Sequence, residues 1–311
     1  MDELTDYDKF EQVVTRLDPG SRLLHMWMLK GGISAQVSAL EILCSNGKTK
    51  RVVVRQYGDM DVNQNPQVAS NEFKLLQLLR SAGLPTPKSY FFDESSEIFA
   101  KPYVVIEFME GQNGIDYIPP DVPTMMSKLA ECLSKIHKVQ YLKQHESFLR
   151  KQIDVLGKLL AGRPVILDET MEEGRIRDTL ELCWTSLQKN QEVVLHGDFW
   201  IGNTLWREGE LVAVIDWEDA AFGDPLADLA NGRLEVLWAF GTDAMHEFTR
   251  QYQFRMPSID FTNLPYWDLC AALRPIAKLS DWGLDEMREK QMRDRLRWFV
   301  SQAFHTLSLL N

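Results

Sequence analysis

The chain has 311 residues, of which 45% are hydrophobic and 25% charged, and its formal net charge at pH 7 is -11. This composition is ordinary for a water-soluble globular protein of about two domains, and the acidic balance argues against a nucleic-acid backbone as the main partner. No run approaches the ~20 apolar residues of a membrane helix, and the acidic start MDELTDYDKFEQ does not resemble a signal peptide, so we expect a cytoplasmic protein without a membrane partner.

The cysteines do not suggest a metal or redox function. The four of them are far apart in the sequence and form no CxxC pair (Cys44, Cys132, Cys183 and Cys270). We therefore expect neither a zinc site nor a disulfide framework, and interpret these thiols as reduced packing residues.

The first third of the chain changes its hydrophobic period several times. An amphipathic helix is predicted around residues 7–17. Apolar runs interrupted by turn residues at 30–32, 45–48 and 57–59 then predict a small antiparallel sheet.

One of these turns is rich in glycine. In LLHMWMLKGGISAQVSALEI, Gly31 and Gly32 lie between two apolar strand candidates, and Ser34 follows closely. A loop of this kind lets backbone amides approach phosphate groups, although two adjacent glycines are also typical of a simple hairpin turn. We take these three residues as candidate nucleotide contacts.

A helix is predicted between residues 65 and 83, because Asn65 and Pro66 are typical of a helix start and Gly83 of a helix end. Glu72 lies on its apolar stripe, and a carboxylate that faces a core needs a cationic partner. Arg55, in the preceding strand KRVVVRQYG, is our candidate. The alternative places Glu72 at the edge of the helix and Arg55 in solvent.

Residues 85–111 predict two more strands with an acidic turn between them. The hydrophobic pattern of the sequence changes after Gly111. From about residue 122 the pattern is mostly helical, with helices expected at 122–139, 145–160, 170–189, 225–254, 266–280 and 284–309. The predicted fold class is therefore α+β: an N-terminal lobe, residues 1–110, with an antiparallel sheet and one helix against it, and a larger, mostly helical lobe, residues 111–311.

The helical part is interrupted by VVLHGDFWIGNTLWREGELVAVIDWED. Thr204–Trp206 and Leu211–Ile215 are apolar runs joined by REGE, which predicts an antiparallel hairpin. In such a hairpin Asn203, before the first strand, and Asp216, after the second, would be neighbours. Asp198 lies on the preceding loop, and three oxygen ligands of this kind suit a hard cation such as Mg²⁺.

The motifs HGDFWIGN and VIDWEDAAFGDPLADLA together resemble those of the aminoglycoside phosphotransferase and choline kinase family, whose pattern is HGDxxxxN, a strand, IDW or IDF, and GDPxxDLA. The resemblance implies a two-lobed protein-kinase-like fold. It also implies a magnesium-dependent kinase that moves the γ-phosphate of ATP or GTP to a hydroxyl group of a small molecule.

Carried onto this sequence, the resemblance makes Asp198 the catalytic aspartate and Asn203 and Asp216 the magnesium ligands. His196 is expected to brace the loop and not to act as an acid or base. Asp224 and Asp228 are also expected to brace it, although an aspartate followed by Pro225 is in itself a typical helix start and Asp228 suits the first turn.

The resemblance also assigns the N-terminal lobe to the nucleotide. Arg55 takes the place of the strand lysine of kinases and would pair with Glu72, although its planar fork binds phosphate with a different geometry. The crossing segment near 107–114 would offer main-chain groups of Glu107, Phe108 and Met109 to the purine.

The acceptor is not specified by the sequence. We expect a hydroxyl-bearing small molecule, with an aminoglycoside, choline, another amino alcohol, a sugar and homoserine as alternatives. The protein itself is expected to be a monomer or a homodimer. The acidic field and the many tryptophans would suit a cationic acceptor, with Glu218, Asp219, Asp268 and Asp281 as candidate contacts, but core packing and surface solvation also account for these residues. A catalytically silent pseudokinase is a further alternative, and a protein kinase is disfavoured because no activation segment follows DWED.

Overall fold

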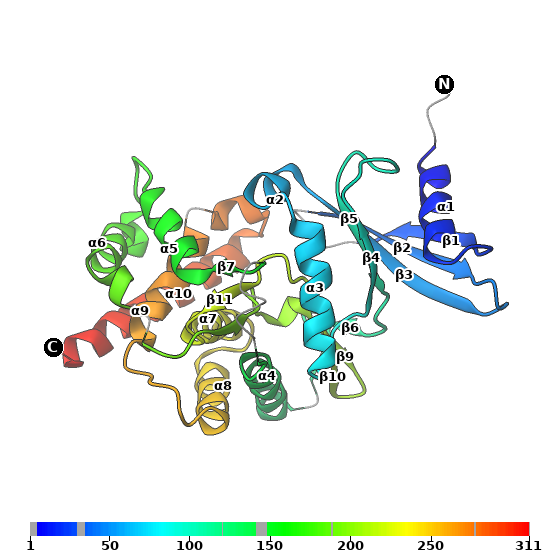
Figure 1. Ribbon diagram of the computed structural model, residues 1–311. Coiled ribbons are helices and arrows are strands. Elements are labelled where there is room, and N and C mark those ends of the chain that lie inside the picture. Colours follow the sequence, from blue (N-terminus) through cyan, green and yellow to red (C-terminus); the bar gives the residue numbers. More distant parts are fainter. Residues whose placement is uncertain are drawn as a thin grey trace. The chain divides into compact units, whose positions relative to one another are not determined.

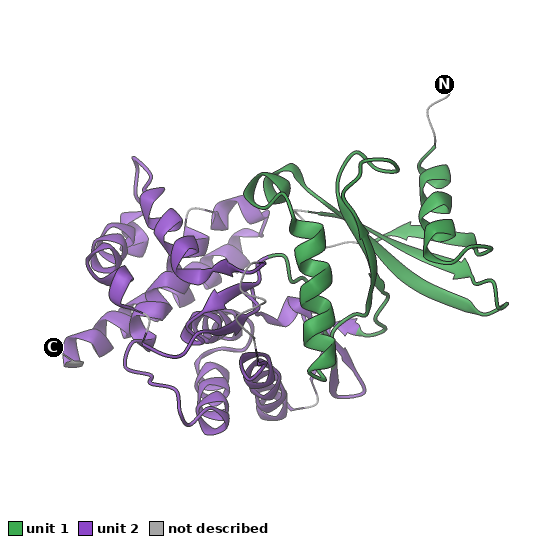
Figure 2. Cartoon of the chain, in the orientation of Figure 1, with its two compact units in different colours: residues 1–111, 212–218 green, residues 112–211, 219–311 purple. Residues whose placement is uncertain are grey.

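The computed structural model describes residues 5–29, 35–119, 121–140, 148–187, 189–276 and 278–310. The chain divides into two compact units (Figure 2): unit 1 comprises Met1–Gly111 with Val212–Glu218, and unit 2 comprises Gln112–Leu211 with Asp219–Asn311. Seven residues that follow the HGD motif thus belong to the N-terminal unit.

Unit 1 is built on a five-stranded antiparallel sheet of order β1-β2-β3-β5-β4 (Figure 1). Its elements in chain order are α1 (Asp6–Leu17), β1 (Arg22–Met28), β2 (Ala35–Leu43), β3 (Thr49–Tyr57), α2 (Asp59–Gln64), α3 (Val68–Ser81), β4 (Ser89–Asp93) and β5 (Tyr103–Glu107). The predicted small antiparallel sheet is confirmed.

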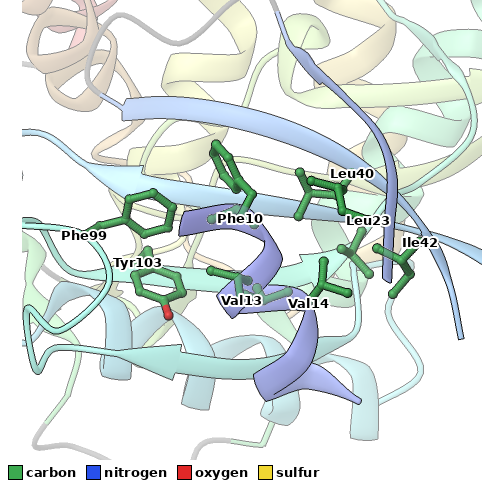
Figure 3. Close-up of a cluster of buried hydrophobic side chains, with 11 residues drawn as sticks. Phe10, Val13, Val14, Leu23, Leu40, Ile42, Phe99 and Tyr103 are labelled. Atoms are coloured by element: carbon green, nitrogen blue, oxygen red, sulfur yellow. The ribbon is translucent and has the colours of Figure 1, made fainter. Parts of the chain in front are cut away.

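Helix α1 covers one face of this sheet. Phe10, Val13 and Val14 of the helix are buried against alternate residues of the strands, among them Leu40 and Ile42 of β2 (Figure 3). Val52 and Val54 of β3 belong to the same cluster. Because successive side chains of a strand point to opposite faces, the residues between them are directed to the other side.

Helix α3 packs on that other face, where Tyr57 and Val104 contact Val68 and Ala69. Arg55 is opposite Val104 in the β3–β5 register, so its side chain is on the α3 face as well. This placement brings a cationic strand residue to the face on which Glu72 of α3 is buried.

The start of α3 differs from our prediction. Asn65 ends the short helix α2, which we did not predict, and its side chain accepts the backbone N–H of Gln67 at 3.1 Å. Pro66 therefore lies in a turn between two helices, and α3 begins at Val68. The Asn-Pro pair indicated a turn correctly, because an asparagine side chain readily closes one, but the turn lies before the helix and not at its first residue.

Unit 2 is mainly helical. Its helices are α4 (Val122–His137), α5 (Gln152–Ala161), α6 (Glu173–Cys183), α7 (Leu226–Phe240), α8 (Thr242–Arg255), α9 (Leu264–Ile276) and α10 (Glu286–Leu310), with short 3-10 turns η2 (Glu169–Met171), η3 (Trp184–Ser186), η4 (Ile201–Asn203) and η5 (Leu279–Trp282). The α+β fold class is confirmed.

Short strands hold the central loop of the HGD motif in place. One sheet has the order β10-β9-β6, with β6 (Gln112–Asn113), β9 (Thr204–Arg207) and β10 (Glu210–Val214). The other has the order β7-β11-β8, with β7 (Arg150–Lys151), β8 (Val193–Leu195) and β11 (Ala221–Gly223). The predicted β9–β10 hairpin is confirmed, whereas β6, β7 and β11 are too short to be recognised from a hydrophobic pattern.

Three helical predictions need correction. The range 170–189 contains the shorter helix α6 between the 3-10 turns η2 and η3, and Glu172, with φ of 55°, separates η2 from α6. The range 225–254 contains two helices, because Gly241 with φ of 89° ends α7 and begins α8. The helix expected at 145–160 starts only at Gln152, after strand β7, and its first residues lie outside the described part of the chain. Within the described ranges, we find no helix with the length and apolar character needed to span a bilayer.

Candidate active site

The loop between β8 and η4 carries Asp198. It turns at Gly197, whose φ is 81°, and a Cβ at this position would lie 1.9 Å from the backbone oxygen of Asp219. Only glycine satisfies both the left-handed conformation and this close approach. The glycine of the HGD motif is therefore required by the backbone.

Asn203 holds the loop from its other end. Its side-chain amide donates to the carbonyl oxygen of Asp198 at 2.9 Å and to the Asp198 carboxylate at 3.2 Å. With the amide nitrogen used in this way, the amide oxygen is the atom that could bind a cation. The structure thus brings together two of the three residues that we predicted for the site.

Asp228, in the first turn of α7, anchors the start of the same loop. Its carboxylate accepts the backbone N–H of His196 at 2.6 Å and of Gly197 at 2.9 Å, and it lies 3.3 Å from Nε2 of His137. Burial by itself raises the pKa of the Asp228 carboxyl, but the hydrogen bond and charge of His137, the charge of His196 and the hydrogen bond from Gly197 together outweigh it, and the pKa is lowered. The carboxylate is therefore ionised and holds the loop to helix α7.

His196 and Asp224 are both buried. Nδ1 of His196 lies 3.3 Å from the backbone N–H of Asp198, so the ring supports the turn. The Asp224 carboxylate accepts the backbone N–H groups of Leu226 at 3.0 Å and of Lys189 and Asn190 at 3.2 Å each. It therefore stabilises the start of α7 and the segment before β8 at the same time.

Arg274 of α9 is a neighbour of Asp198 that the sequence did not indicate. Its guanidinium lies 3.4 Å from the Asp198 carboxylate and donates to the carbonyl of Gly197 and to Oδ1 of Asn231 at 3.0 Å each. Asn231 could have been found, since it follows Asp228 by three residues on one helix face. Arg274 could not, because it is 76 residues from Asp198 and belongs to no local pattern.

A second arginine lies beside this loop. Arg150 pairs with Asp219, and Arg274 lies 4.0 Å from the same carboxylate. Burial raises the pKa of Asp219, but the two arginines, Arg150 first, more than reverse this effect and lower the pKa. Asp219 is thus an ionised partner of arginines.

In unit 1, Asp216 is bound to Arg55. Nη2 of Arg55 donates to the Asp216 carboxylate at 2.7 Å and also to the carboxylate of Glu218. Asp216 has a φ of 66°, a left-handed conformation that is uncommon for a residue other than glycine. Such strain is frequently found at functional sites.

The expected pair of Arg55 and Glu72 is present as a long contact, with 3.9 Å between Nε of Arg55 and the Glu72 carboxylate. The hydrogen bond to Glu72 comes from the hydroxyl of Tyr57 at 2.6 Å. Glu72 is buried, so the alternative of a glutamate at the helix edge does not apply.

Of the six remaining nucleotide candidates, the structure describes three: Glu107, Phe108 and Met109. The backbone N–H of Glu107 donates to Lys88 at 2.8 Å and that of Phe108 to Arg51 at 3.4 Å, while the Glu107 side chain pairs with Arg80 at 2.9 Å. Met109 follows β5 by two residues. Gly31, Gly32 and Ser34 lie outside the described residues.

Asn203 and Asp216 belong to different units, so their joint binding of a metal stays a prediction. Within the described ranges, no three histidine, cysteine or acidic side chains are grouped so that they could hold a metal ion. The set that we predicted is of another kind, since it consists of one carboxylate and one amide completed by nucleotide phosphates.

Comparison with known proteins gives the family. A model of the phosphotransferase enzyme family matches residues 31–261. Acyl-CoA dehydrogenase family member 11 of Rattus norvegicus is 26% identical over 238 residues, which cover 65% of this chain and 29% of that protein. Hygromycin-B 4-O-kinase of Escherichia coli is 25% identical over 194 residues, which cover 58% of this chain and 55% of the kinase. The chain therefore spans less than a third of the first of these relatives and about half of the second.

The fold is also that of a solved phosphotransferase. A thermostable mutant of aminoglycoside phosphotransferase APH(4)-Ia, crystallised with ADP and hygromycin B, superimposes with a TM-score of 0.65 and 19% identity. The match covers 94% of this chain and 97% of that one. The protein-kinase-like fold expected from the motifs is confirmed.

Proposed function

This chain belongs to the phosphotransferase enzyme family, and we propose that it transfers the γ-phosphoryl group of ATP or GTP to a hydroxyl group of a small molecule. The observation that carries the proposal is the loop of Asp198. Its position is fixed by Gly197, by Asn203 and by the Asp228 carboxylate, and this many independent constraints on one partly exposed carboxylate are typical of a reactive group.

Asp198 would orient the acceptor. Its carboxylate accepts the hydrogen bond of the acceptor hydroxyl, whose oxygen attacks the γ-phosphorus while the bond from that phosphorus to the bridging oxygen of the nucleotide breaks. The hydroxyl proton passes to Asp198, and the nucleoside diphosphate leaves. His196 and Asp228 act through the backbone of the loop and not on the substrate.

Asn203 and Asp216 would hold Mg²⁺. An amide oxygen and a carboxylate are hard ligands that suit this ion, and the remaining positions would be taken by nucleotide phosphates and water. When bound, the ion neutralises phosphate charge.

The N-terminal lobe, residues 1–110, would bind the nucleotide, and residues 111–311 would supply the catalytic loop and the acceptor site. Arg55, held near Glu72, would contact the phosphates, together with Gly31, Gly32 and Ser34. A row of paired apolar residues crosses the sheet on the same face as Arg55: Trp27, Ala39, Val53 and Ile106. Such an apolar surface would cover a purine. The main chain at Glu107, Phe108 and Met109 would contact its edge.

The acceptor is a hydroxyl-bearing small molecule. Of the four acidic residues that could receive a cationic acceptor, Glu218, Asp219 and Asp268 each pair with an arginine, and Asp281 is exposed. An acceptor screen should therefore not be limited to amines. It should include aminoglycosides, choline and other amino alcohols, sugars, homoserine and, because several relatives are acyl-CoA dehydrogenase family members, a hydroxyl-bearing acyl-CoA.

Asp198→Asn gives the decisive test of the mechanism. Removal of the proton acceptor should lower kcat by about 100-fold or more, while the Kd of the nucleotide changes by less than about threefold. Radiolabelled phosphate transfer measures the first quantity and calorimetry the second. Asp178→Asn, which removes an exposed carboxylate paired with Arg163 in unit 2, is the matched control and should keep its activity.

Near wild-type turnover of Asp198→Asn would contradict the assignment. Tight binding of ATP or GTP without transfer to any acceptor or to water would instead favour the pseudokinase. Parallel assays with both nucleotides and Mg²⁺ separate these outcomes.

A further inference from the structure

The guanidinium of Arg55 lies among three carboxylates of unit 1. It donates to Asp216 at 2.7 Å and to Glu218 through the same nitrogen, Nη2, and its Nε is 3.9 Å from Glu72. The side chain of Arg55 is only 8% exposed. An arginine buried in this way depends on its carboxylates to replace the water that it has lost.

The two glutamates have different roles in this cluster. Glu72 accepts the Tyr57 hydroxyl at 2.6 Å, whereas Nε of Arg55 is buried and has no hydrogen-bond partner in the part of the chain that the structure describes. Burial, followed by the charge of Glu72, raises the pKa of Tyr57 well above its usual value, so this hydroxyl remains a donor. Glu72 therefore offers Arg55 mainly its charge, and the hydrogen bonds come from Asp216 and Glu218.

The three carboxylates around Arg55 differ in their exposure to solvent. One guanidinium is shared among three carboxylates. The Asp216 side chain is 33% exposed, against 16% for Glu218 and 3% for Glu72. Asp216 is thus the carboxylate that an external divalent cation can reach.

We propose that Glu218 is a positioning residue for Arg55: it holds the guanidinium in place when Asp216 turns to the metal and the nucleotide phosphates. The inference rests on the proposed function, because it takes Asp216 as a magnesium ligand. Once Asp216 engages the ion, Glu218 is the remaining carboxylate that accepts a hydrogen bond from Arg55 in this cluster.

The presence of an arginine at position 55 explains why a second carboxylate is needed. A guanidinium carries five N–H donors in a planar fork, while an ammonium group is a compact charge on a flexible chain. A lysine at this position would be satisfied by fewer acceptors. Arg55→Lys should therefore make the protein largely independent of Glu218.

A double-mutant cycle on nucleotide binding tests this coupling. Calorimetry gives the Kd of ADP for wild type, Glu218→Gln, Arg55→Lys and the double variant, each with Mg²⁺ and with EDTA. With Mg²⁺ we expect Glu218→Gln to weaken binding by about tenfold in the wild-type background and by less than about twofold in the Arg55→Lys background. With EDTA, Asp216 still holds Arg55, and the loss should be below about threefold.

The matched control is Glu97→Gln, which removes an exposed carboxylate paired with Arg16 in unit 1 and should not change the Kd. If Glu218→Gln does not fold, Glu218→Asp keeps the charge on a shorter chain and should show the same magnesium-dependent loss with a smaller size. Thermal melting of each variant identifies the folded proteins.

Additive effects of the two substitutions, or an equal loss with Mg²⁺ and with EDTA, would overturn the inference. A wild-type protein that binds neither ADP nor GDP would overturn the proposed function, and the inference with it. The two failures are therefore distinguished by the wild-type titration alone.

Discussion

At the scale of single residues, Gly197 is the position where the backbone leaves least freedom. Both its positive φ and the close backbone oxygen of Asp219 exclude a side chain. Gly283 has a similar conformation, with φ of 65°, but nothing lies within 4 Å of the position of a Cβ. Alanine substitutions at Gly197 and Gly283 therefore separate the cost of the backbone conformation from the cost of the contact with Asp219.

Gly197→Ala should therefore lower the free energy of unfolding by about 3 kcal/mol or more, since the loop must move, while Gly283→Ala costs only about 1 kcal/mol. Chemical denaturation with fluorescence detection measures both values. Equal losses in the two variants would show that the contact with Asp219 has no role.

Glu235, close to the candidate site, is expected to make the stability of the folded protein depend on pH. It lies on α7 four residues after Asn231, and burial, together with the negative charge of Asp198, raises its pKa from 4.5 to about 8. The folded state therefore retains a proton that the unfolded chain has lost at pH values between these two. Since the unfolded state binds fewer protons there, stability decreases as the pH rises from about 4.5 to about 8.

Glu235→Gln, which is neutral at every pH, should remove this decrease. We expect the variant to be more stable than wild type by about 2 kcal/mol at pH 9 and equally stable near pH 4.5. Melting curves of both proteins across this range provide the measurement. A constant difference between them at all pH values would rule out titration of Glu235 as the cause.

At the scale of elements, α7 organises the loop that carries Asp198. Asp228 in its first turn accepts two backbone N–H groups of the loop, and Asn231 one turn later accepts from Arg274 and donates to the carbonyl of Phe199 at 3.3 Å. A helix is rigid, so these contacts place the loop relative to α7 and α9 as one body. Local unfolding of the start of α7 would thus displace Asp198.

Asp228→Asn tests this connection. The amide oxygen can accept only one of the two backbone N–H groups that the carboxylate accepts, and the amide NH₂ group would face the other one. We therefore expect the free energy of unfolding to fall by about 2 to 3 kcal/mol. Asp243→Asn is the matched control, because Asp243 also lies in the first turn of a helix, α8, but is exposed. It should cost less than about 0.5 kcal/mol. Comparable thermal shifts in the two variants would indicate that Asp228 acts only on the helix dipole.

At the scale of the whole molecule, the chain returns to unit 1 for the seven residues Val212–Glu218. This segment supplies the backbone N–H of Val214, which donates to Pro85 at 2.7 Å, and the carboxylates of Asp216 and Glu218. The first 111 residues are therefore an incomplete structural unit, although they contain the whole five-stranded sheet.

We expect a fragment of residues 1–111 to lack a cooperative melting transition, since it leaves Arg55 without two of its three carboxylates. The same fragment with Arg55→Met and Glu72→Leu removes the buried charges and should be the more stable of the two. Circular dichroism on heating compares them. A cooperative transition of the unmodified fragment at the higher temperature would contradict this account.

Much of this architecture could be predicted from the sequence. Clear hydrophobic periodicity and turn residues predict the fold class, the helices α1, α4 and α10, and the β9–β10 hairpin. Strands of two or three residues such as β7 and β11 could not be predicted, because they carry no period and exist only through their partners. The division of the helix expected at 225–254 depends on one glycine, Gly241, and a glycine within a helical pattern can either be tolerated or end the helix.

The sequence by itself determined the family and the loop that carries Asp198, because these depend on motifs within about 40 adjacent residues. Only the tertiary structure decided which charges meet: Arg274 with Asp198, Arg150 with Asp219, and Arg55 with Glu218 instead of a close bond to Glu72. The physical reason is that a buried charge requires a partner in space, whereas its sequence neighbours specify only that such a partner must exist.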